Sequence, residues 1–177
     1  MPFKDKTMRA LYIGRFQPYH LGHQLVLQKI SEEVGEIVII IGSAQESHCL
    51  ENPFTAGERI AMIYGALGEL RDRCYVIPLQ DIKRNAVWVS HLISMVPRFD
   101  IVYSNNNLVV QLFSEAGVAI RKPPLYRREV YSGTAIRKLM VEGGDWRSLV
   151  PVSVASVIGE IEGVNRLANV SKNDAVL

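Results

Sequence analysis

The segment at residues 36–42, EIVIIIG, constrains the fold most strongly because it is a run of β-branched apolar residues. A strand that is apolar on both faces is typical of a parallel sheet with helices on both sides. Similar runs occur at 9–14 (RALYIG), 74–79 (CYVIPL) and 100–104 (DIVYS), and amphipathic stretches separate them. This alternation predicts an α/β fold with a Rossmann-like, doubly wound parallel sheet.

Helices are predicted between these strands from the spacing of apolar residues and from capping patterns. After residue 21, Leu27, Ile30 and Val34 recur at helical spacing. Thr55 followed by Glu58 forms a capping-box pattern, so a second helix should begin just after Thr55. We expect further helices at about 87–96, 108–115, 132–142 and 151–161, and a short strand at 118–120.

Length and composition favour one compact domain. The chain has 177 residues, of which 48% are hydrophobic and 21% charged, which suits a single domain over 1–177 with a sizeable core. We expect that core to span about 8–163 and to be followed by a C-terminal tail of about 164–177, of which the stretch NVSKNDAVL at 169–177 is expected to be frayed.

Charge and cysteine content argue against several classes of function. The net charge is only +2 and no block of like charges occurs, so neither nucleic acid nor a membrane surface is an expected partner. Cys49 and Cys74 lie far apart without metal-ligand spacing, which fits a reducing, cytoplasmic location. The first ten residues lack the apolar core of a signal peptide, and the apolar runs are too short to span a bilayer.

Residues 14–23, GRFQPYHLGH, place polar side chains where the first strand ends and a helix should begin. In an open α/β sheet, ligands collect at the carboxyl ends of strands, where helix N-termini expose unpaired N–H groups. Gly14 allows the backbone to turn close to a ligand, Pro18 stiffens the loop, and Gly22 leaves room beside the first helical turn. The stretch is therefore a candidate ligand site.

His20 and His23 are three residues apart, so both imidazoles project to the same side of a helix that starts near Leu21. At that helix end they would face the same phosphate group. Two histidines at this spacing also occur on helices by chance, and that alternative stays open. Metal ligation is a further alternative, but it needs a third ligand, and no cysteine or acidic cluster lies nearby in the sequence.

The same stretch resembles the HxGH signature of the nucleotidyltransferase superfamily, and GRFQP resembles the archaeal-type nicotinamide-nucleotide adenylyltransferases. A second motif, YSGTAIR at 131–137, resembles the SGTxIR segment that opens a helix and holds the ATP triphosphate in that family. The resemblance extends from residue 8 to about residue 163. It also includes GSAQESH at 42–48, NPFTAGER at 52–59 and DIKRNAVWV at 81–89.

The resemblance implies a reaction between ATP and nicotinamide mononucleotide (NMN). The 5′-phosphate of NMN would attack the α-phosphorus of ATP and give NAD and pyrophosphate without a covalent enzyme intermediate. A phosphate monoester has a second pKa of about 6, so this nucleophile is ionised near neutral pH and needs no general base. The family also implies Mg²⁺ bound through the ATP phosphates and a homo-oligomer, a hexamer.

The family motifs assign roles to residues that match them. The implied catalytic residues are Arg15, His20, His23 and Arg137. The implied ATP and phosphate contacts also include Gly14, Phe16, Gln17, Gly22, Ser132, Gly133 and Thr134. The implied NMN contacts are Ser43, Asp81, Asn85 and Trp88.

The NMN residues also have a physical use. Trp88 offers a flat, electron-rich face on which a cationic pyridinium ring can stack, although a tryptophan is also a common core residue. Asn85 can both donate to and accept from a carboxamide. The charge of Asp81 should repel the carboxylate of nicotinic acid mononucleotide, which predicts a preference for the amide substrate.

Several alternatives remain open. Another transferase of this fold could use pantetheine phosphate, a flavin precursor or a polyol phosphate as acceptor, because the HxGH signature does not separate these. A non-catalytic nucleotide sensor would not require the whole set of phosphate donors. A fragment of an aminoacyl-tRNA synthetase should contain a KMSKS-like segment, and none is present. By themselves, the residues at 132–137 could form an ordinary capped helix. YRREV at 126–130 is interpreted as a solvated loop, although its position before the triphosphate motif leaves electrostatic help as an alternative.

Overall fold

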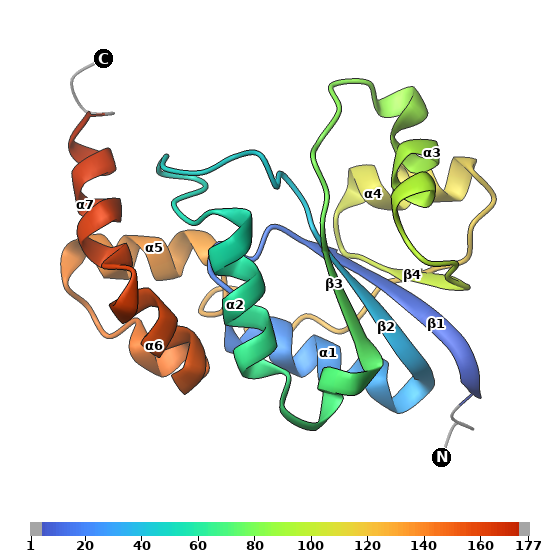
Figure 1. Cartoon of the computed structure of the whole chain (residues 1–177), viewed down its shortest axis with the longest axis horizontal. Helices are drawn as coiled ribbons and strands as arrows, with labels where there is room; N and C mark the ends of the chain where they lie inside the picture. Colours follow the sequence, from blue (N-terminus) through green and yellow to red (C-terminus); the bar gives the residue numbers. More distant parts are fainter. Residues whose placement is uncertain (1–4, 174–177) are drawn as a thin grey trace.

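A parallel sheet forms the centre of the protein in the computed structural model, which describes residues 5–173 (Figure 1). Its strands are β1 (Asp5–Gly14), β2 (Val34–Ile41), β3 (Cys74–Pro78), β4 (Ile101–Tyr103) and β5 (Ile120–Arg121). The strand order is β3-β2-β1-β4-β5, and every neighbouring pair is parallel. The predicted doubly wound α/β sheet is confirmed.

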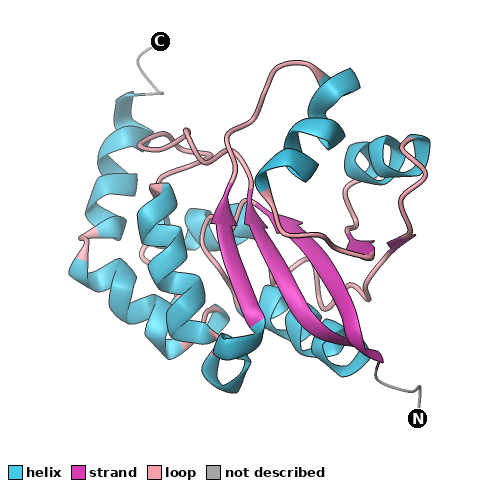
Figure 2. Ribbon diagram, turned by 45° about the vertical axis from the view of Figure 1, so that its right-hand side comes forward, coloured by secondary structure: helices cyan, strands magenta, loops and turns pink. Residues whose placement is uncertain are grey.

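Helices cover both faces of this sheet (Figure 2). They are α1 (Leu21–Glu33), α2 (Ala56–Ala66), α3 (Asn85–Met95), α4 (Asn107–Glu115), α5 (Gly133–Glu142), α6 (Val152–Glu160) and α7 (Gly163–Asn173). Two short 3₁₀ helices occur at Gly68–Arg73 and Arg147–Leu149. Between residues 5 and 173, no helix has the length and apolar character that crossing a bilayer requires.

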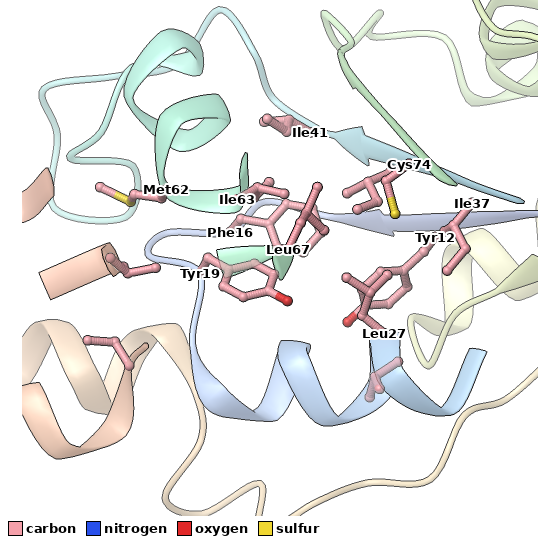
Figure 3. Packing of buried hydrophobic residues seen from close by; sticks show 14 of the residues in the cluster. Tyr12, Phe16, Tyr19, Leu27, Ile37, Ile41, Met62, Ile63, Leu67 and Cys74 are labelled. Atoms are coloured by element: carbon pink, nitrogen blue, oxygen red, sulfur yellow. The ribbon is translucent and has the colours of Figure 1, made fainter. Parts of the chain in front are cut away.

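Two hydrophobic clusters lie on opposite faces of the sheet, and β2 contributes to both. Ile37, Ile39 and Ile41 belong to a cluster that also contains buried residues of α1, α2, α5, α6 and α7 (Figure 3). Val38 and Ile40 point to the other face and pack with α3 and α4. All five side chains are fully buried, which confirms that this apolar run forms a strand covered on both faces.

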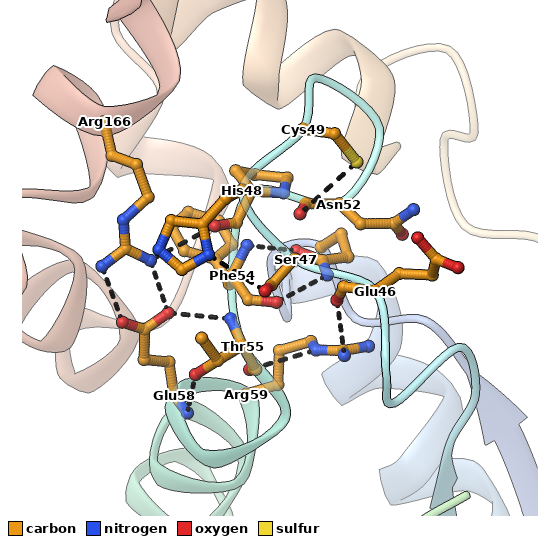
Figure 4. A network of polar contacts seen from close by, with 12 residues as sticks. Glu46, Ser47, His48, Cys49, Asn52, Phe54, Thr55, Glu58, Arg59 and Arg166 are labelled. Atoms are coloured by element: carbon orange, nitrogen blue, oxygen red, sulfur yellow. Dashed lines mark hydrogen bonds and ion pairs between the residues drawn. The ribbon is translucent and has the colours of Figure 1, made fainter. Parts of the chain in front are cut away.

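The capping box predicted for α2 is present. The Thr55 hydroxyl accepts from the backbone N–H of Glu58 at 3.2 Å, and the Thr55 N–H donates to the Glu58 carboxylate at 2.8 Å. These bonds fix the start of α2 immediately after the loop that follows β2. The same carboxylate accepts two hydrogen bonds from Arg166, at 2.7 and 2.8 Å (Figure 4).

Arg166 belongs to α7, which occupies most of the expected C-terminal tail and includes residues 169–173 of the stretch that was expected to be frayed. Leu167 of this helix is fully buried, and α7 packs against α5 and α6. The sequence GVNRLANVSKN is mostly polar, but Val164, Leu167 and Val170 recur at intervals of three, a spacing that is typical of one apolar face on a surface helix. Residues 174–177 of the expected tail lie outside the described residues, and the assignment of one domain stays a prediction.

The order of the strands creates a crevice beside the first strand. The chain passes from β1 to β2 on one side and later returns to β4 on the other side of β1. At such a switch point, the loops that leave the two central strands diverge and open a space at the carboxyl edge. Here those loops begin after Gly14 and after Tyr103.

Candidate active site

A cavity of about 660 Å³ opens at the carboxyl ends of the strands, a size typical of small-molecule sites. The segments that line it follow all five strands, and the last of them reaches the start of α5. They lie within residues 12–26, 42–43, 81–88, 104–112 and 123–133. The two motifs singled out by the sequence, 14–23 and 131–137, therefore meet at one site.

His20 and His23 form a reciprocal capping pair at the start of α1. His20 is the N-cap residue, and its Nδ1 accepts from the backbone N–H of His23 at 3.3 Å. The backbone N–H of His20 donates to Nδ1 of His23 at 3.2 Å. The two rings are stacked with their centroids 3.6 Å apart. Helix α1 begins at Leu21, so the expected common orientation of the imidazoles is confirmed.

These contacts determine which ring nitrogens carry hydrogen. A neutral imidazole that accepts through Nδ1 carries its proton on Nε2. Burial lowers the pKa of His20 to about 4, and burial together with the nearby His20 lowers the pKa of His23 well below its ordinary value. At neutral pH both side chains are therefore uncharged and have an Nε2–H donor available for a ligand in the cavity.

The lowered pKa of His20 predicts an acid-sensitive fold. Between the ordinary pKa of 6.5 and about 4, the unfolded chain binds a proton at this residue that the folded chain does not bind. The free energy of unfolding should be fully retained above pH 6.5. It should fall as the pH drops through that window, where the proton at His20 contributes a slope of about 1.4 kcal/mol per pH unit and His23 adds to it because its pKa is lowered as well. Urea unfolding from pH 7.5 to 4.5 measures this slope.

His20→Asn is a matched control for that measurement, because asparagine is a good N-cap residue without a titrating ring. The variant should show a shallower loss of stability below pH 6.5. If the wild-type and variant profiles were parallel across the window, the imidazole would not be the titrating group.

The start of α5 lies directly against the loop that follows β1. Gly22 lies close to Tyr131, and a Cβ on this glycine would be 2.8 Å from Cβ of Tyr131. A Cβ on Gly133 would be 2.9 Å from the backbone oxygen of Gln17. Because of these close approaches, the N-termini of α1 and α5 both reach the cavity, where Gly22, His23, Ser132 and Gly133 line the wall. The first N–H groups of a helix lack intrahelical partners, so the site attracts anions.

Arg15 is exposed and lines the cavity, as a phosphate-binding side chain should. Residues 127–129 are exposed, as expected for a solvated loop, and Arg128 also lines the cavity, which fits the alternative of electrostatic help from this segment. With the two imidazoles and the two helix ends, these guanidinium groups make the phosphate side of the cavity rich in donors and positive charge.

Four of the residues implied to contact ATP lie outside the cavity wall. Phe16 is buried against Tyr12, Tyr19 and the His23 ring. The Gln17 side chain is buried and bonds both backbone groups of Phe54. Thr134 and Arg137 do not line the cavity either. Arg137 is buried, and burial lowers the pKa of its guanidinium.

Arg137 instead joins the two motifs. Its guanidinium donates to the backbone oxygen of Gln17 at 2.8 Å and contacts the Thr134 hydroxyl at 3.5 Å. A direct contact between this side chain and a phosphate stays a prediction.

The implied NMN residues lie together on the β2 and β3 side of the cavity. The Ser43 hydroxyl donates to the Asp81 carboxylate at 2.6 Å, and both residues line the wall with Asn85 and Trp88. Trp88 is only 8% exposed and packs edge-on against Phe113 at 5.9 Å between ring centroids. Its ring therefore belongs to the core and to the cavity wall at the same time.

Sequence reasoning missed the wall on the other side of β1. It is formed by the loop that follows β4 and by the segment after β5, with Ser104, Asn105, Asn106, Pro123, Pro124, Leu125 and Tyr126. The signal was available, because a loop that follows a parallel strand lies at the same edge as the motif after β1. Within residues 5–173, no group of three histidine, cysteine or acidic side chains is arranged to hold a metal ion.

The sequence and the fold match a known class of protein. The cytidylyltransferase-like family pattern matches residues 11–139, and the chain belongs to this family of nucleotidyltransferases. A bifunctional NMN adenylyltransferase/ADP-ribose pyrophosphatase from Francisella tularensis, solved with AMP and a manganese ion, has a similar fold with a TM-score of 0.75. It is 20% identical, and the match covers 96% of this chain and 53% of that one.

Closer relatives define the group within the family. A nicotinamide-nucleotide adenylyltransferase from Methanothrix thermoacetophila is 69% identical over 94% of this chain and 98% of its own length. The same enzyme from Halobacterium salinarum is 54% identical over 94% of both chains. The predicted resemblance to the nicotinamide-nucleotide adenylyltransferases is confirmed, and the chain is a member of that group of enzymes.

Proposed function

We propose that this cavity transfers AMP from ATP to NMN by direct in-line displacement, giving NAD and pyrophosphate. The observation that carries the proposal is the convergence of two Nε2–H imidazoles and two helix N-termini on one cavity. Such a set binds phosphates and offers donors to charge that develops in a transition state.

The chemistry needs positioning and charge stabilisation rather than a base. The NMN phosphate is ionised near neutral pH, since its second pKa is about 6. His20 and His23 would donate to oxygens of the α- and β-phosphates as charge moves toward the departing pyrophosphate. Arg15 and Arg128 would bind the remaining phosphate oxygens, with the α5 N-terminus beside them.

Magnesium fits this site as a partner of the phosphates. Among the described residues that line the cavity, Asp81 is the one carboxylate, and its Oδ2 already accepts from Ser43. Mg²⁺ readily binds through substrate phosphates and water instead of an all-protein cage. When bound, it would neutralise part of the triphosphate charge, and the protein groups would hold the phosphate oxygens that it leaves free.

The order of the strands suggests how the two nucleotides are placed. The loops after β3 and β4 lie on opposite sides of β1, which ends at the phosphate site. The β3 side, with Asp81, Asn85 and Trp88, suits the nicotinamide ring and favours the amide over nicotinic acid mononucleotide. The β4 side, with Asn105 and the apolar residues after β5, is left for the adenosine of ATP.

Trp88→Ala should affect both NMN binding and stability. Loss of the stacking surface should raise KM for NMN by about 10-fold, within the roughly 0.5 to 2 kcal/mol expected for a cation over an aromatic ring. KM for ATP should change little. Tm should fall because the ring also packs against Phe113. Steady-state kinetics below the unfolding transition and a thermal melt measure these effects.

Leu92→Ala is the control, since Leu92 is fully buried in the same cluster and does not line the cavity. It should lower Tm and leave both KM values near wild type. If Trp88→Ala raised the KM values for NMN and ATP equally, the ring would serve the core alone.

Assembly and location form part of the same proposal. The archaeal-type family forms hexamers, so light scattering should give about six times the 19.9 kDa chain mass. A mass equal to one chain in dilute buffer would contradict a hexamer. A cytoplasmic location is consistent with the free thiols of Cys49 and Cys74 and with a reaction that consumes ATP.

The substrate assignment is tested by incubating the protein with ATP, Mg²⁺ and one acceptor at a time. NMN should give NAD and an equal amount of pyrophosphate, with slower turnover for nicotinic acid mononucleotide. Pyrophosphate release with pantetheine phosphate, FMN or a polyol phosphate, but not with NMN, would assign another acceptor. ATP binding without any pyrophosphate release would indicate a nucleotide sensor.

A further inference from the structure

Arg59 in α2 is a fully buried cation that donates to backbone carbonyls from several segments. Figure 4 shows its guanidinium beneath the loop that carries Glu46. The accepting oxygens belong to Thr55 at 3.2 Å, Arg15 at 3.0 Å, Gly42 at 2.9 Å, Ser43 at 3.1 Å, Ala44 at 3.5 Å and Glu46 at 3.4 Å.

Stability alone does not account for a charge in this place. No carboxylate is among its hydrogen-bond acceptors, and burial lowers the pKa of Arg59 to about 10, with a further decrease from the nearby charge of Arg15. The group therefore remains cationic at neutral pH in a buried position. Burying a cation is expensive, and apolar side chains often stabilise such a position as well or better.

The carbonyls that accept from Arg59 belong to two different loops, one proposed to contact the ATP phosphates and one proposed to contact NMN. One nitrogen, Nη1, bonds both Arg15, on the phosphate side, and Gly42, at the end of β2. The other, Nη2, bonds Ser43, whose hydroxyl contacts Asp81 on the NMN side. Ser43 also has a φ of 47°, a left-handed conformation that a non-glycine residue keeps only when its surroundings impose it.

We infer that Arg59 is a positioning residue that fixes the loop of Arg15 relative to the loop of Ser43, and thereby aligns the ATP and NMN phosphates for in-line attack. The inference rests on the adenylyl transfer proposed above. Each loop contacts its own substrate, so either nucleotide can bind while the loops are misaligned. Alignment matters at the moment of attack, where a displacement of about 1 Å can cost about 100-fold in rate.

Arg59→Lys tests this inference. Lysine keeps the charge, but its single nitrogen cannot hold the carbonyls of Arg15, Gly42 and Ser43 together. We expect kcat to fall about 10- to 100-fold, while KM for ATP and KM for NMN each stay within about threefold of wild type. An unchanged kcat in the folded variant would overturn the inference.

Arg73→Lys is the matched control. Arg73 also donates to three backbone carbonyls, those of Ser31, Val34 and Gly35, but it precedes β3 at the edge of the sheet opposite the cavity. Arg73→Lys should lower Tm as Arg59→Lys does, and it should leave kcat near wild type. An equal loss of kcat in both variants would make the effect one of general stability and would contradict the inference.

A second variant, Arg59→Ala, tests the inference if Arg59→Lys folds poorly. Arg59→Ala should regain part of its kcat when guanidinium ion is added at low millimolar concentration, while Arg73→Ala should not. If neither Arg59 variant folded, even with guanidinium, the residue would serve stability alone and the inference would fail. Wild-type protein in the same assay separates the inference about Arg59 from the proposed function. Failure of the wild type to form NAD would refute the proposed function itself.

Discussion

Replacing His20 or His23 by alanine should lower kcat about 100-fold or more in at least one of the two variants, with a much smaller effect on ATP binding. Both imidazoles present an Nε2–H to the cavity because their Nδ1 atoms accept backbone N–H groups. A donor of this kind contributes most when negative charge grows on the phosphate oxygens, which happens during attack and departure. Single-turnover kinetics together with ATP titration separates the two effects.

Two controls make this prediction specific. His20→Asn should retain the helix cap and hence the stability, but it should lose kcat, whereas His20→Ala should also lose about 1 kcal/mol for the missing cap. His91→Ala, which removes a histidine outside the cavity wall, should leave kcat unchanged. Turnover near wild type in both His20→Ala and His23→Ala would refute the donor mechanism.

Gly133→Ala should reduce both stability and turnover because it separates the two motifs. The new Cβ would lie 2.9 Å from the Gln17 backbone oxygen and 3.0 Å from Nη1 of Arg137. A backbone oxygen cannot move aside cheaply, so the start of α5 must shift away from the loop after β1. We expect a loss of about 1 to 3 kcal/mol in the free energy of unfolding, as for other overpacked sites. kcat should fall about 10-fold because the helix end leaves the phosphate site.

Gly159→Ala is the matched control in another helix, α6. A Cβ there meets no heavy atom within 4 Å, so alanine should stabilise the helix by about 1 kcal/mol or leave the stability unchanged. Urea unfolding and steady-state kinetics of both variants test the comparison. If the two alanine variants had equal stability and turnover, the close approach at Gly133 would have no functional importance.

The features that could be predicted from sequence depend on local patterns. The apolar run in β2 indicated a strand covered on both faces, and Thr55 with Glu58 indicated the start of α2. The spacing of His20 and His23 was sufficient to place both rings at the start of one helix. Each of these inferences uses residues within one helical turn or one strand, where backbone geometry determines side-chain direction.

The features that could not be predicted depend on contacts between distant segments. The bond from Arg137 to Gln17 spans 120 positions, and no local pattern specifies that the guanidinium donates to this backbone oxygen. The contacts of Arg59 could not be predicted because its partners are backbone carbonyls, which leave no trace in the residue types. Helix α7 is held by Leu167 and by the ion pair between Arg166 and Glu58, which lies 108 positions away.

The stereochemistry of transfer tests the central claim most directly. Wild-type protein is given NMN, Mg²⁺ and ATP that carries one sulfur on its α-phosphorus in a single configuration. Direct in-line attack predicts a thio-substituted NAD with inverted configuration at that phosphorus, together with an equal amount of pyrophosphate. Retention of configuration would require an intermediate on the enzyme and would contradict direct displacement, and the absence of a dinucleotide product would contradict the proposed transfer.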